Sequence, residues 1–386
     1  MDKKWNTGYN VRMENMDRQP IRVAQVLGKM NSGGVEAVVM NYYRAMDRSK
    51  VQFDFFLDRN SSFPQREEIE RLGGRYYLVP PYYLGFSYFF TLKRLFRENG
   101  YHIVHGQLNT VNALPLLAAK CAGVPVRICH NHSTGNWAEG PKTLVKHLLR
   151  PFARLWATDD FACGIATGRW MFGKKKMDEG RVRIVPNAVE TSGLLFQESE
   201  RQARRAELGI GPDAFLVGHV GRFTFAKNHA YLIDIFEALH KKAPDSILLL
   251  VGEGNLRDAV ERKVRHKHLE DCIRFLGVQK DIGSFYSAMD VFCLPSNYEG
   301  FPVVAVEAQL NGLPCVVSDS VTDEVSMSGN VERLSLKAGP EAWAKALYAM
   351  RNRRLTPEQS VIRRFDIHAQ ADVLMNVYLQ MQGRNE

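Results

Sequence analysis

The 386-residue sequence lacks both the long apolar run of a membrane-spanning helix and the cysteine spacings of disulfide-rich or zinc-binding proteins. No segment approaches the roughly 18 consecutive apolar residues that a span needs. The first twenty residues are polar and contain no apolar signal core, so we expect residues 1–20 to form a flexible tail. The six cysteines are scattered without a Cys-x-x-Cys pair, which favours reduced, buried thiols in a cytoplasmic protein.

Familiar nucleotide and metal motifs are also missing. The chain has neither a P-loop nor a complete Gly-x-Gly-x-x-Gly sequence, because Arg257 stands where a third glycine would have to follow Gly252 and Gly254. There is no Asp-x-Asp pair. His130 and His132 lie close in sequence, but without an acidic third ligand nearby they indicate zinc only weakly. We therefore expect neither a metal ion nor a cofactor.

What the chain does have is an ordinary globular composition with a basic surplus. Its length suits two domains, and 45% apolar with 24% charged residues is typical of a soluble protein. The net charge of +9 indicates an anionic partner, namely nucleotide phosphates, an anionic membrane surface or nucleic acid. Because no nucleic-acid-binding motif is recognisable, a nucleic-acid-binding protein is an alternative that rests on charge alone, and we expect no nucleic-acid partner.

Short apolar runs alternate with helical patterns from residue 21 onward, which predicts parallel α/β sheets. In such sheets the residues just past the carboxyl ends of the strands face the ligand crevice. His105 and His130 are expected there, after strands 103–104 and 126–129. The other strands are expected at 21–27, 51–57, 75–79, 161–162, 182–185, 215–220, 247–251, 273–276, 291–294 and 313–317.

The segment 291–319 organises the second half of the chain. It indicates a buried strand, a polar loop, a helix over 303–310 and a second strand, which together have the size of one βαβ unit. Pro302 suits the first turn of this helix, because its missing N–H would have no partner there anyway. Glu299 lies in the loop, and Glu307 lies inside the helix among apolar residues.

Glu307 requires an explanation, because an unpaired buried carboxylate is costly. One interpretation places it on the solvent side of the helix or beside an arginine. The other, which we favour, makes it a hydrogen-bond acceptor for the hydroxyl groups of a ligand. The start of the helix, after Gly300 and Phe301, adds free backbone N–H groups and a partial positive charge.

Two further loops between a strand and a helix carry glycine or cations. Gly33-Gly34 is either a tight turn or a place where the backbone approaches a phosphate. Gly221 opens a loop in which Arg222 and Lys227 are five residues apart. Such a pair suits a diphosphate, since Arg supplies a forked donor and Lys a mobile charge. Two surface cations are the plainer interpretation of that loop taken alone.

Taken together, these segments resemble the retaining GT-B glycosyltransferases of family four, over nearly the whole chain after residue 20. The resemblance rests on Glu-Gly-Phe-Pro at 299–302 and on Glu307, with seven residues between the two glutamates. The glycine pair, the histidine and the two cations also follow the family's order. The family includes sucrose synthases, bacterial mannosyltransferases and many exopolysaccharide or capsule enzymes.

The resemblance implies two Rossmann-like domains whose parallel sheets face an inter-domain cleft. We expect an acceptor-side domain over 21–189, a nucleotide-sugar-binding domain over 190–365, and a last helix over 366–386 that crosses back to the first domain. A charged helix at 198–208 is expected to bridge the domains. The resemblance also implies transfer with retention of anomeric configuration and without a metal ion.

Four residues are expected to be catalytic. By the resemblance, His130 lies close to the donor sugar and the acceptor, while His132 only orients its loop. Arg222 and Lys227 would hold the donor diphosphate and neutralise its charge as it leaves. Glu299 would hold the sugar together with nearby backbone amides.

The remaining expected site residues would bind substrate. The glycine pair would lie near the donor pyrophosphate and the acceptor, Glu307 would accept hydrogen bonds from the ribose, and Val278 would mark the place of the base. The substrate-binding set is Gly33, Gly34, Gly221, Val278, Gly300, Phe301, Pro302 and Glu307.

The chain departs from the family pattern in two places. Ala188 replaces the usual glycine in Asn187-Ala188-Val189, so the turn there is expected to differ. The segment 320–324 lacks the glycines that normally precede a glutamate, which leaves the role of that loop open.

The expected reaction moves a hexose from a nucleotide-diphosphate sugar, by preference a UDP-sugar, to a saccharide acceptor that we take to be lipid-linked. A non-hydrolysing UDP-sugar 2-epimerase, which shares the fold and size, is the alternative. The basic amphipathic segment 142–157, which Pro151 should break or kink, and the aromatic segment 82–90 would suit docking on an anionic membrane. Packing of that helix on the protein's own sheet is the other open interpretation.

Overall fold

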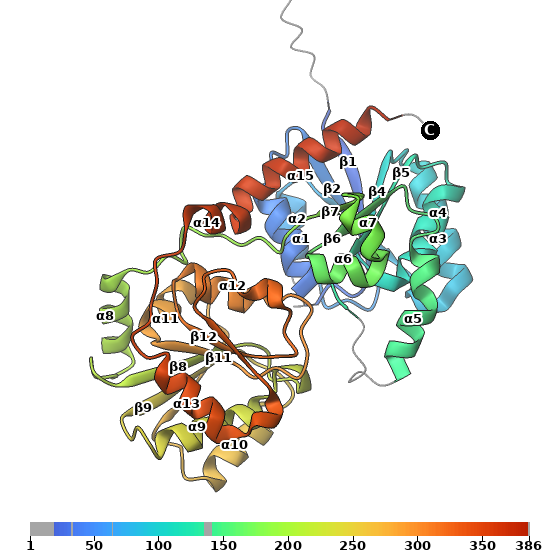
Figure 1. Cartoon of the computed structure of the whole chain (residues 1–386). Helices are drawn as coiled ribbons and strands as arrows, with labels where there is room; N and C mark the ends of the chain where they lie inside the picture. The colour runs from blue at the N-terminus through green and yellow to red at the C-terminus, as the bar shows by residue number, and fades with distance from the viewer. Residues whose placement is uncertain (1–18, 32–33, 64, 135–140, 385–386) are drawn as a thin grey trace, which may run out of the picture.

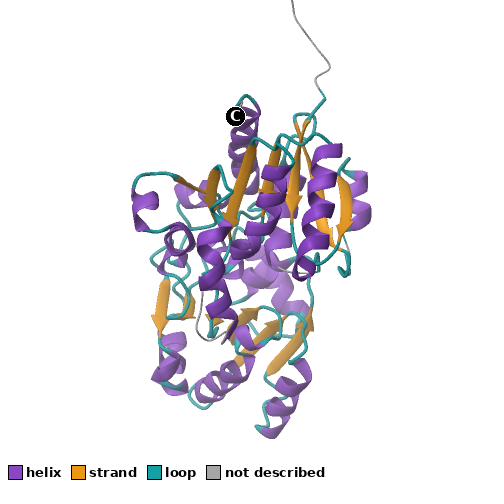
Figure 2. Ribbon diagram, turned by 90° about the vertical axis from the view of Figure 1, so that its right-hand side faces the viewer, coloured by secondary structure: helices purple, strands orange, loops and turns teal. Residues whose placement is uncertain are grey.

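The computed structural model describes residues 19–31, 34–63, 65–134 and 141–384. They form two halves, each with one parallel sheet between helices (Figure 1, Figure 2). The predicted fold class of two parallel α/β domains is confirmed. The expected tail lies outside the described residues except for positions 19 and 20, and so does the predicted site residue Gly33.

The first half contains a seven-stranded sheet in the order β3-β2-β1-β4-β5-β6-β7. The order changes direction between β1 and β4, where Val23 pairs with Ile103, and a crevice at the carboxyl edge is expected at such a point. Its strands are β1 (Ile21–Val26), β2 (Val51–Asp58), β3 (Arg75–Val79), β4 (Ile103–Gly106), β5 (Val126–Asn131), β6 (Asp159–Ala162) and β7 (Val182–Ile184). Its helices are α1 (Gly34–Ala45), α2 (Arg66–Arg71), α3 (Gly85–Glu98), α4 (Ala113–Cys121), α5 (Pro141–Ala153), α6 (Ile165–Phe172) and α7 (Lys174–Asp178).

This sheet is covered on both faces. All eight residues of β2 are buried, as expected for an inner strand with helices on each side. One core joins the sheet to α1, and the other joins it to α3 and α4. β2 therefore lies inside the sheet, between β1 and β3, with helices on both faces.

The second half repeats the design with six strands in the order β10-β9-β8-β11-β12-β13. Its two cores lie on opposite faces, one under α9, α10 and α13 and the other under α11, α12 and α14. Its strands are β8 (Phe215–Val220), β9 (Ser246–Val251), β10 (Ile273–Gly277), β11 (Val291–Leu294), β12 (Cys315–Ser318) and β13 (Val331–Leu334). Its helices are α8 (Glu198–Glu207), α9 (His229–His240), α10 (Arg257–His266), α11 (Ile282–Ala288), α12 (Val303–Leu310), α13 (Pro340–Ala349) and α14 (Gln359–Phe365).

The last helix, α15 (Ile367–Gln382), leaves the second half and packs into the core of the first (Figure 1). The chain thus passes between the halves twice, and the two passages lie side by side. Val189 forms a parallel bridge with Asp366, and Thr191 Oγ1 donates to Asp366 Oδ2 at 2.6 Å. Asp366 also caps α15 by accepting from Ala369 N at 2.9 Å. Two connecting segments that are hydrogen-bonded to each other therefore link the two domains.

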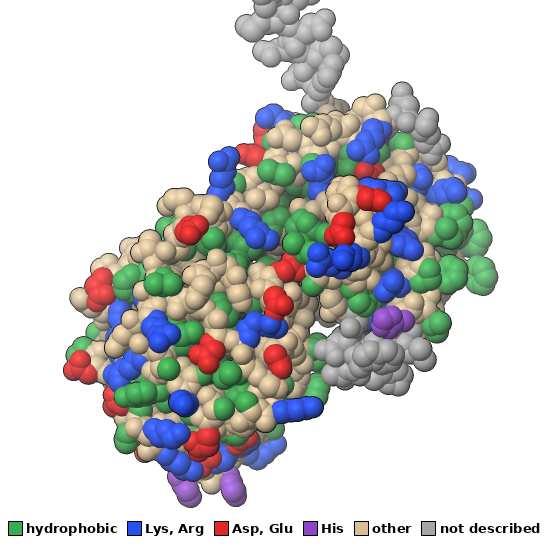
Figure 3. Space-filling view, in the orientation of Figure 1, with side chains coloured by type: hydrophobic (Ala, Val, Ile, Leu, Met, Phe, Trp, Pro, Cys, Tyr) green, Lys and Arg blue, Asp and Glu red, His purple; other side chains and the backbone are tan. Residues whose placement is uncertain are grey.

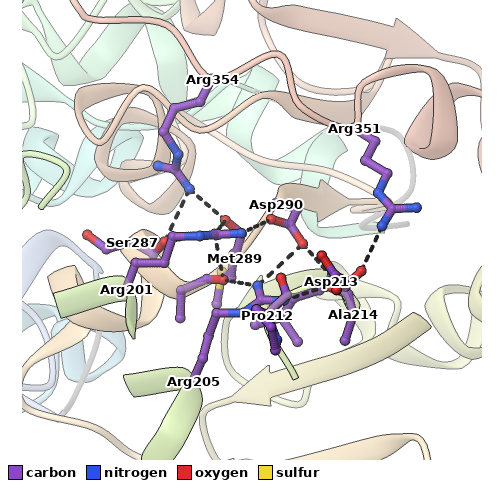
Figure 4. Close-up of polar contacts among 12 residues, drawn as sticks. Arg201, Arg205, Pro212, Asp213, Ala214, Ser287, Met289, Asp290, Arg351 and Arg354 are labelled. Atoms are coloured by element: carbon purple, nitrogen blue, oxygen red, sulfur yellow. Dashed lines mark hydrogen bonds and ion pairs between the residues drawn. The ribbon is translucent and has the colours of Figure 1, made fainter. Parts of the chain in front are cut away.

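The charged helix predicted to bridge the domains does not do so. α8 packs on α11 within the second half, at the end remote from the first half (Figure 1). Arg201 and Arg205 both contact the carboxylate of Asp290, which precedes β11 (Figure 4). Arg205 also donates to the carbonyl oxygen of Gly211 at 3.0 Å. The cationic side of α8 is therefore satisfied inside its own domain, so the bridging prediction is wrong.

Several predicted boundaries also change. β4 and β5 extend further than expected, so His105 and His130 lie inside strands and not past their ends. α5 continues through Pro151 to Ala153, so of the expected break or kink at the proline the break does not occur. β13 was not predicted.

Candidate active site

A cavity of about 430 Å³ lies between the two halves. Its walls come from segments that directly follow β1, β5, β7, β8 and β11, so the carboxyl edges of both sheets face it. This is the usual place for a ligand in open parallel sheets.

The loop after β8 supplies the cationic part of the wall. Gly221 opens this loop, and a Cβ there would be tightly packed, 3.1 Å from His219 Nε2 and 3.2 Å from the Lys227 side chain. Arg222 follows and is exposed at the cavity. Its charge opposes the rise that burial causes in the pKa of Glu36, a residue of α1 in the other half. The arginine therefore acts electrostatically across the cleft.

Lys227 Nζ forms an ion pair with Glu299 Oε1 at 2.7 Å, and the two side chains are 17% and 14% exposed. Ser296 Oγ donates to the same carboxylate oxygen at 2.8 Å. Asn297 ties the two loops together, since its backbone N donates to Ala226 O at 2.8 Å. The cation and the carboxylate are therefore held at fixed positions in the cavity wall.

Helix α12 begins at this wall. Its first residues, Val303 and Val304, line the cavity together with Gly300, Phe301 and Pro302. The first-turn N–H groups of a helix have no partners within it and carry a partial positive charge. An anionic or strongly accepting group in the cavity would therefore be stabilised at this end of α12.

Glu307 lies one turn further along α12, on the same face as Val303 and Val304. Tyr286 Oη donates to its Oε2 at 2.9 Å. Among the described residues, Tyr286 is the one hydrogen-bond partner of the Glu307 carboxylate, so Oε1 is left as an acceptor. Burial raises the pKa of Glu307, while the hydrogen bond from Tyr286 and the charge of Lys227 act against that rise. Its partner is thus a tyrosine and not an arginine.

The first half supplies the opposite wall from the start of α1, from His132 and Ser133 after β5, and from Asn187. The walls touch each other: a Cβ on Gly300 would lie 2.7 Å from the carbonyl oxygen of His132. Asn187 Nδ2 donates to Phe301 O at 3.4 Å. Glycine at position 300 therefore permits the close approach of the two domains.

The two predicted histidine positions are exchanged. The prediction placed His130 at the cleft and gave His132 an orienting role. His132 lines the cavity, whereas His130 lies behind it and is 3% exposed. The reason is that β5 pairs with β6 as far as Asn131, so His132 is the first residue past the strand. Burial lowers the pKa of His132 to about 4, so its ring is neutral at pH 7.

Most of the other predicted site residues meet at this cavity. Two predicted residues are not part of its lining: Glu307, which lies one helical turn beyond Val303, and Val278, which is 74% exposed. The prediction missed Asn187, although its segment had been singled out by the family pattern. The predicted residues that line the cavity are Gly34, Gly221, Arg222, Lys227, Glu299, Gly300, Phe301 and Pro302.

Replacing Gly300 with alanine is expected to hold the domains slightly apart, because the new Cβ meets a backbone oxygen that has little freedom to move. Overpacking of this kind costs roughly 1 kcal/mol or more, so kcat/KM should fall about fivefold. Gly211→Ala is the control, since a Cβ at that position meets nothing within 4 Å. Steady-state kinetics and small-angle scattering would test this, and equal behaviour of the two variants would contradict it.

Within the described residues, no three or more His, Cys, Asp or Glu side chains are grouped closely enough to hold a metal ion. In the same part of the chain, no helix is both long and apolar enough to cross a membrane.

Comparison with known proteins identifies the family. The family model for glycosyltransferase family 4 matches residues 32–192. The family model for glycosyl transferases group 1 matches residues 200–358. The chain is 39% identical over 377 residues to a Bacillus subtilis (strain 168) protein named "Putative glycosyltransferase EpsF", covering 94% of this chain and 97% of that one. The chain belongs to the family 4 glycosyltransferases. This family 4 enzyme is also 26% identical to an Escherichia coli UDP-Gal:alpha-D-GlcNAc-diphosphoundecaprenol alpha-1,3-galactosyltransferase, over 78% of this chain and 79% of the relative.

Solved structures of similar shape show the GT-B fold. Anabaena Alr3699/HepE, crystallised with UDP and glucose, superposes with a TM-score of 0.75 at 18% identity and covers 93% of this chain and 99% of its own. The lipopolysaccharide glycosyltransferase WaaG superposes with a TM-score of 0.63 at 14% identity, over 94% and 96% of the two chains. The predicted GT-B architecture is therefore confirmed.

Proposed function

We propose that this family 4 glycosyltransferase moves a hexose from a UDP-sugar to a lipid-linked saccharide, with retention of configuration at the anomeric carbon. The observation that carries the proposal is the meeting of Arg222, the Lys227–Glu299 pair and the start of α12 at one inter-domain cavity. Cations and a helix start suit a diphosphate, and carboxylates beside them suit the hydroxyl groups of a sugar.

Each side chain then has a defined task. Arg222 and Lys227 would bind the diphosphate and stabilise the charge that grows on it as the sugar departs. Because Lys227 is already paired with Glu299, the arriving phosphate would share the lysine and leave the carboxylate oriented toward the sugar. Glu307 Oε1 would accept a hydrogen bond from the ribose.

Retention would follow from attack on the face that the diphosphate leaves. The anomeric carbon–oxygen bond to the β-phosphate breaks, the bond to the acceptor oxygen forms on the same face, and the acceptor proton passes to the departing phosphate oxygen. The described cavity wall supports this route, because its cationic groups stand where that phosphate would be held. An inverted linkage in the product would contradict it.

The relatives support the choice of donor and acceptor. The solved Anabaena protein was crystallised with UDP-glucose, and the name of the Escherichia coli relative specifies a UDP-galactose donor and a diphosphoundecaprenol acceptor. The 22% identical CapH of Staphylococcus aureus, which matches 93% of this chain and 99% of its own, is named for capsular polysaccharide biosynthesis. We carry these features to this chain as part of the proposal.

An apolar surface on the first half supports a lipid-linked acceptor at the inner face of the cell membrane. Phe86 and Phe90 of α3 are 84% and 59% exposed, and hydrophobic side chains gather over this edge (Figure 3). On α5, Leu148 and Phe152 are 63% and 56% exposed, so its apolar stripe is not fully packed on the protein. The basic Arg150 lies between them in sequence, as in helices that rest on anionic lipid.

The proposal is tested by incubating the purified enzyme with UDP-glucose, UDP-galactose or UDP-N-acetylglucosamine, each with and without a polyprenyl-diphosphate saccharide. We expect acceptor-dependent UDP release and a glycosylated lipid whose new linkage keeps the anomeric configuration of the donor. Formation of an epimeric UDP-sugar without acceptor would replace the proposal with the epimerase alternative. Absence of transfer from every donor would refute it.

A further inference from the structure

A chain of buried hydrogen bonds leads inward from His132. His132 Nε2 lies 2.6 Å from Gln107 Oε1, Gln107 Nε2 donates to Gln25 Oε1 at 2.9 Å, and Gln25 Nε2 donates to Tyr378 Oη at 3.2 Å. None of these four side chains is more than 7% exposed. His132 is thus connected to the last helix, α15, through two glutamines.

The chain continues beyond the tyrosine. Tyr378 Oη lies 2.7 Å from His105 Nδ1, and His105 Nε2 lies 3.1 Å from His130 Nδ1. His105 and His130 are 1% and 3% exposed. The buried position of His130 behind the cavity is therefore part of a continuous network and not an isolated core histidine.

The orientation of the two glutamine amides determines which group donates and which accepts along the network. Gln107 presents its oxygen to His132, so the proton of that ring lies on Nε2. Tyr378 accepts from Gln25, which leaves its own proton available for His105 Nδ1. Reversing the amide of Gln107 or of Gln25 alone would bring two donors or two acceptors face to face, so these two amides can reverse only together.

This direction decides which ring nitrogen of His132 is left without a partner. With its proton on Nε2, the neutral ring has a lone pair on Nδ1, and this buried atom has no partner among the described residues. His132 is also the one member of the network that lines the inter-domain cavity. A hydroxyl group of a ligand would satisfy Nδ1, whereas a carbonyl group would not.

We propose that Tyr378 is a positioning residue that, through the two glutamines, holds His132 with its proton on Nε2 and so presents Nδ1 to a hydroxyl of the bound saccharide. The inference rests on the proposed function, since it needs a saccharide in the cleft. It gives the returning helix α15 a part in the active site that the cavity lining alone does not reveal.

The test compares Tyr378→Phe with Tyr42→Phe. Tyr42 is also buried in the core of the first half, and its hydroxyl donates to the carbonyl oxygen of Pro186 at 2.8 Å, so each variant loses one buried tyrosine hydroxyl. Nitrogen-15 NMR of the histidine rings should show His132 protonated on Nε2 in the wild type and in Tyr42→Phe. In Tyr378→Phe we expect a mixture of the two neutral forms. His132→Gln identifies the His132 signals.

Kinetics supply the second measurement. In Tyr378→Phe we expect kcat to fall roughly tenfold, which corresponds to the net free energy of about one ordinary hydrogen bond. The KM for the donor should stay unchanged. Tyr42→Phe should lose thermal stability to a similar extent while kcat stays near the wild-type value. Identical NMR spectra and kcat in the two tyrosine variants would overturn the proposal, as would a wild-type His132 protonated on Nδ1.

Gln25→Met interrupts the same network at another link while keeping the length of the side chain. It should reproduce both effects of Tyr378→Phe, which covers the case in which that variant fails to fold. The NMR comparison needs no substrate. A wild type that transfers no sugar would therefore overturn the proposed function, whereas the ring spectra would still decide whether Tyr378 holds His132.

Discussion

Replacing Lys227 with alanine is expected to lower kcat by about 10²- to 10³-fold, the effect of removing one group that stabilises developing charge. The lysine is held at the cavity by its 2.7 Å ion pair with Glu299, and that carboxylate keeps the bond from Ser296 when the lysine is gone. The loop should therefore remain folded. Steady-state kinetics and thermal unfolding, measured on the same preparation, would show a large loss of turnover with a small change in Tm.

Lys242→Ala is the matched control, because Lys242 also pairs with a glutamate at 2.7 Å but lies far more exposed, outside the cavity lining. It should leave kcat unchanged. Lys227→Arg keeps the charge with a different shape and is expected to fall between the wild type and the alanine variant. Parallel losses of turnover and Tm in Lys227→Ala would show that the lysine is structural.

The second half of the site was predictable from sequence because its parts are local. Gly221, Arg222 and Lys227 lie in one loop, and the unit from Glu299 to Glu307 is one loop and one helix. The strands that carry them were predicted exactly, at 215–220 and 291–294, because buried parallel strands read as short continuous apolar runs. Local patterns of this kind need no knowledge of tertiary contacts.

The first half of the site was predicted less well because it depends on long-range pairing. Whether His130 or His132 faces the cleft is decided by how far β5 pairs with β6, about thirty residues away in sequence. A shift of two residues keeps the same face of the strand but changes which side chain stands beyond its end. The contact between Tyr378 and His105 could not be predicted from local sequence either, because the whole second half of the chain lies between these two residues.

The charged helix α8 shows the same limitation for charge patterns. The sequence predicted that this helix bridges the domains, whereas its arginines contact Asp290 and the carbonyl groups near it within the second half (Figure 4). A cationic helix face therefore gives little information about its partner. A carboxylate among apolar residues of a helix, such as Glu307, gives more, because few partners suit a carboxylate in such a place.

Replacing Glu307 with alanine is expected to weaken binding of UDP by roughly 1.5–3 kcal/mol, about 10- to 150-fold in Kd, because a hydrogen bond between a hydroxyl and a charged acceptor is lost. Isothermal titration with UDP alone measures this without an acceptor. Tyr286→Phe separates the two roles of the carboxylate, since it removes the bond to Oε2 and leaves Oε1 in place. If Tyr286→Phe weakened UDP binding as much as Glu307→Ala, the glutamate would act through the packing of α11 against α12 and not through the ribose. Unchanged affinity in Glu307→Ala would remove the ribose contact altogether.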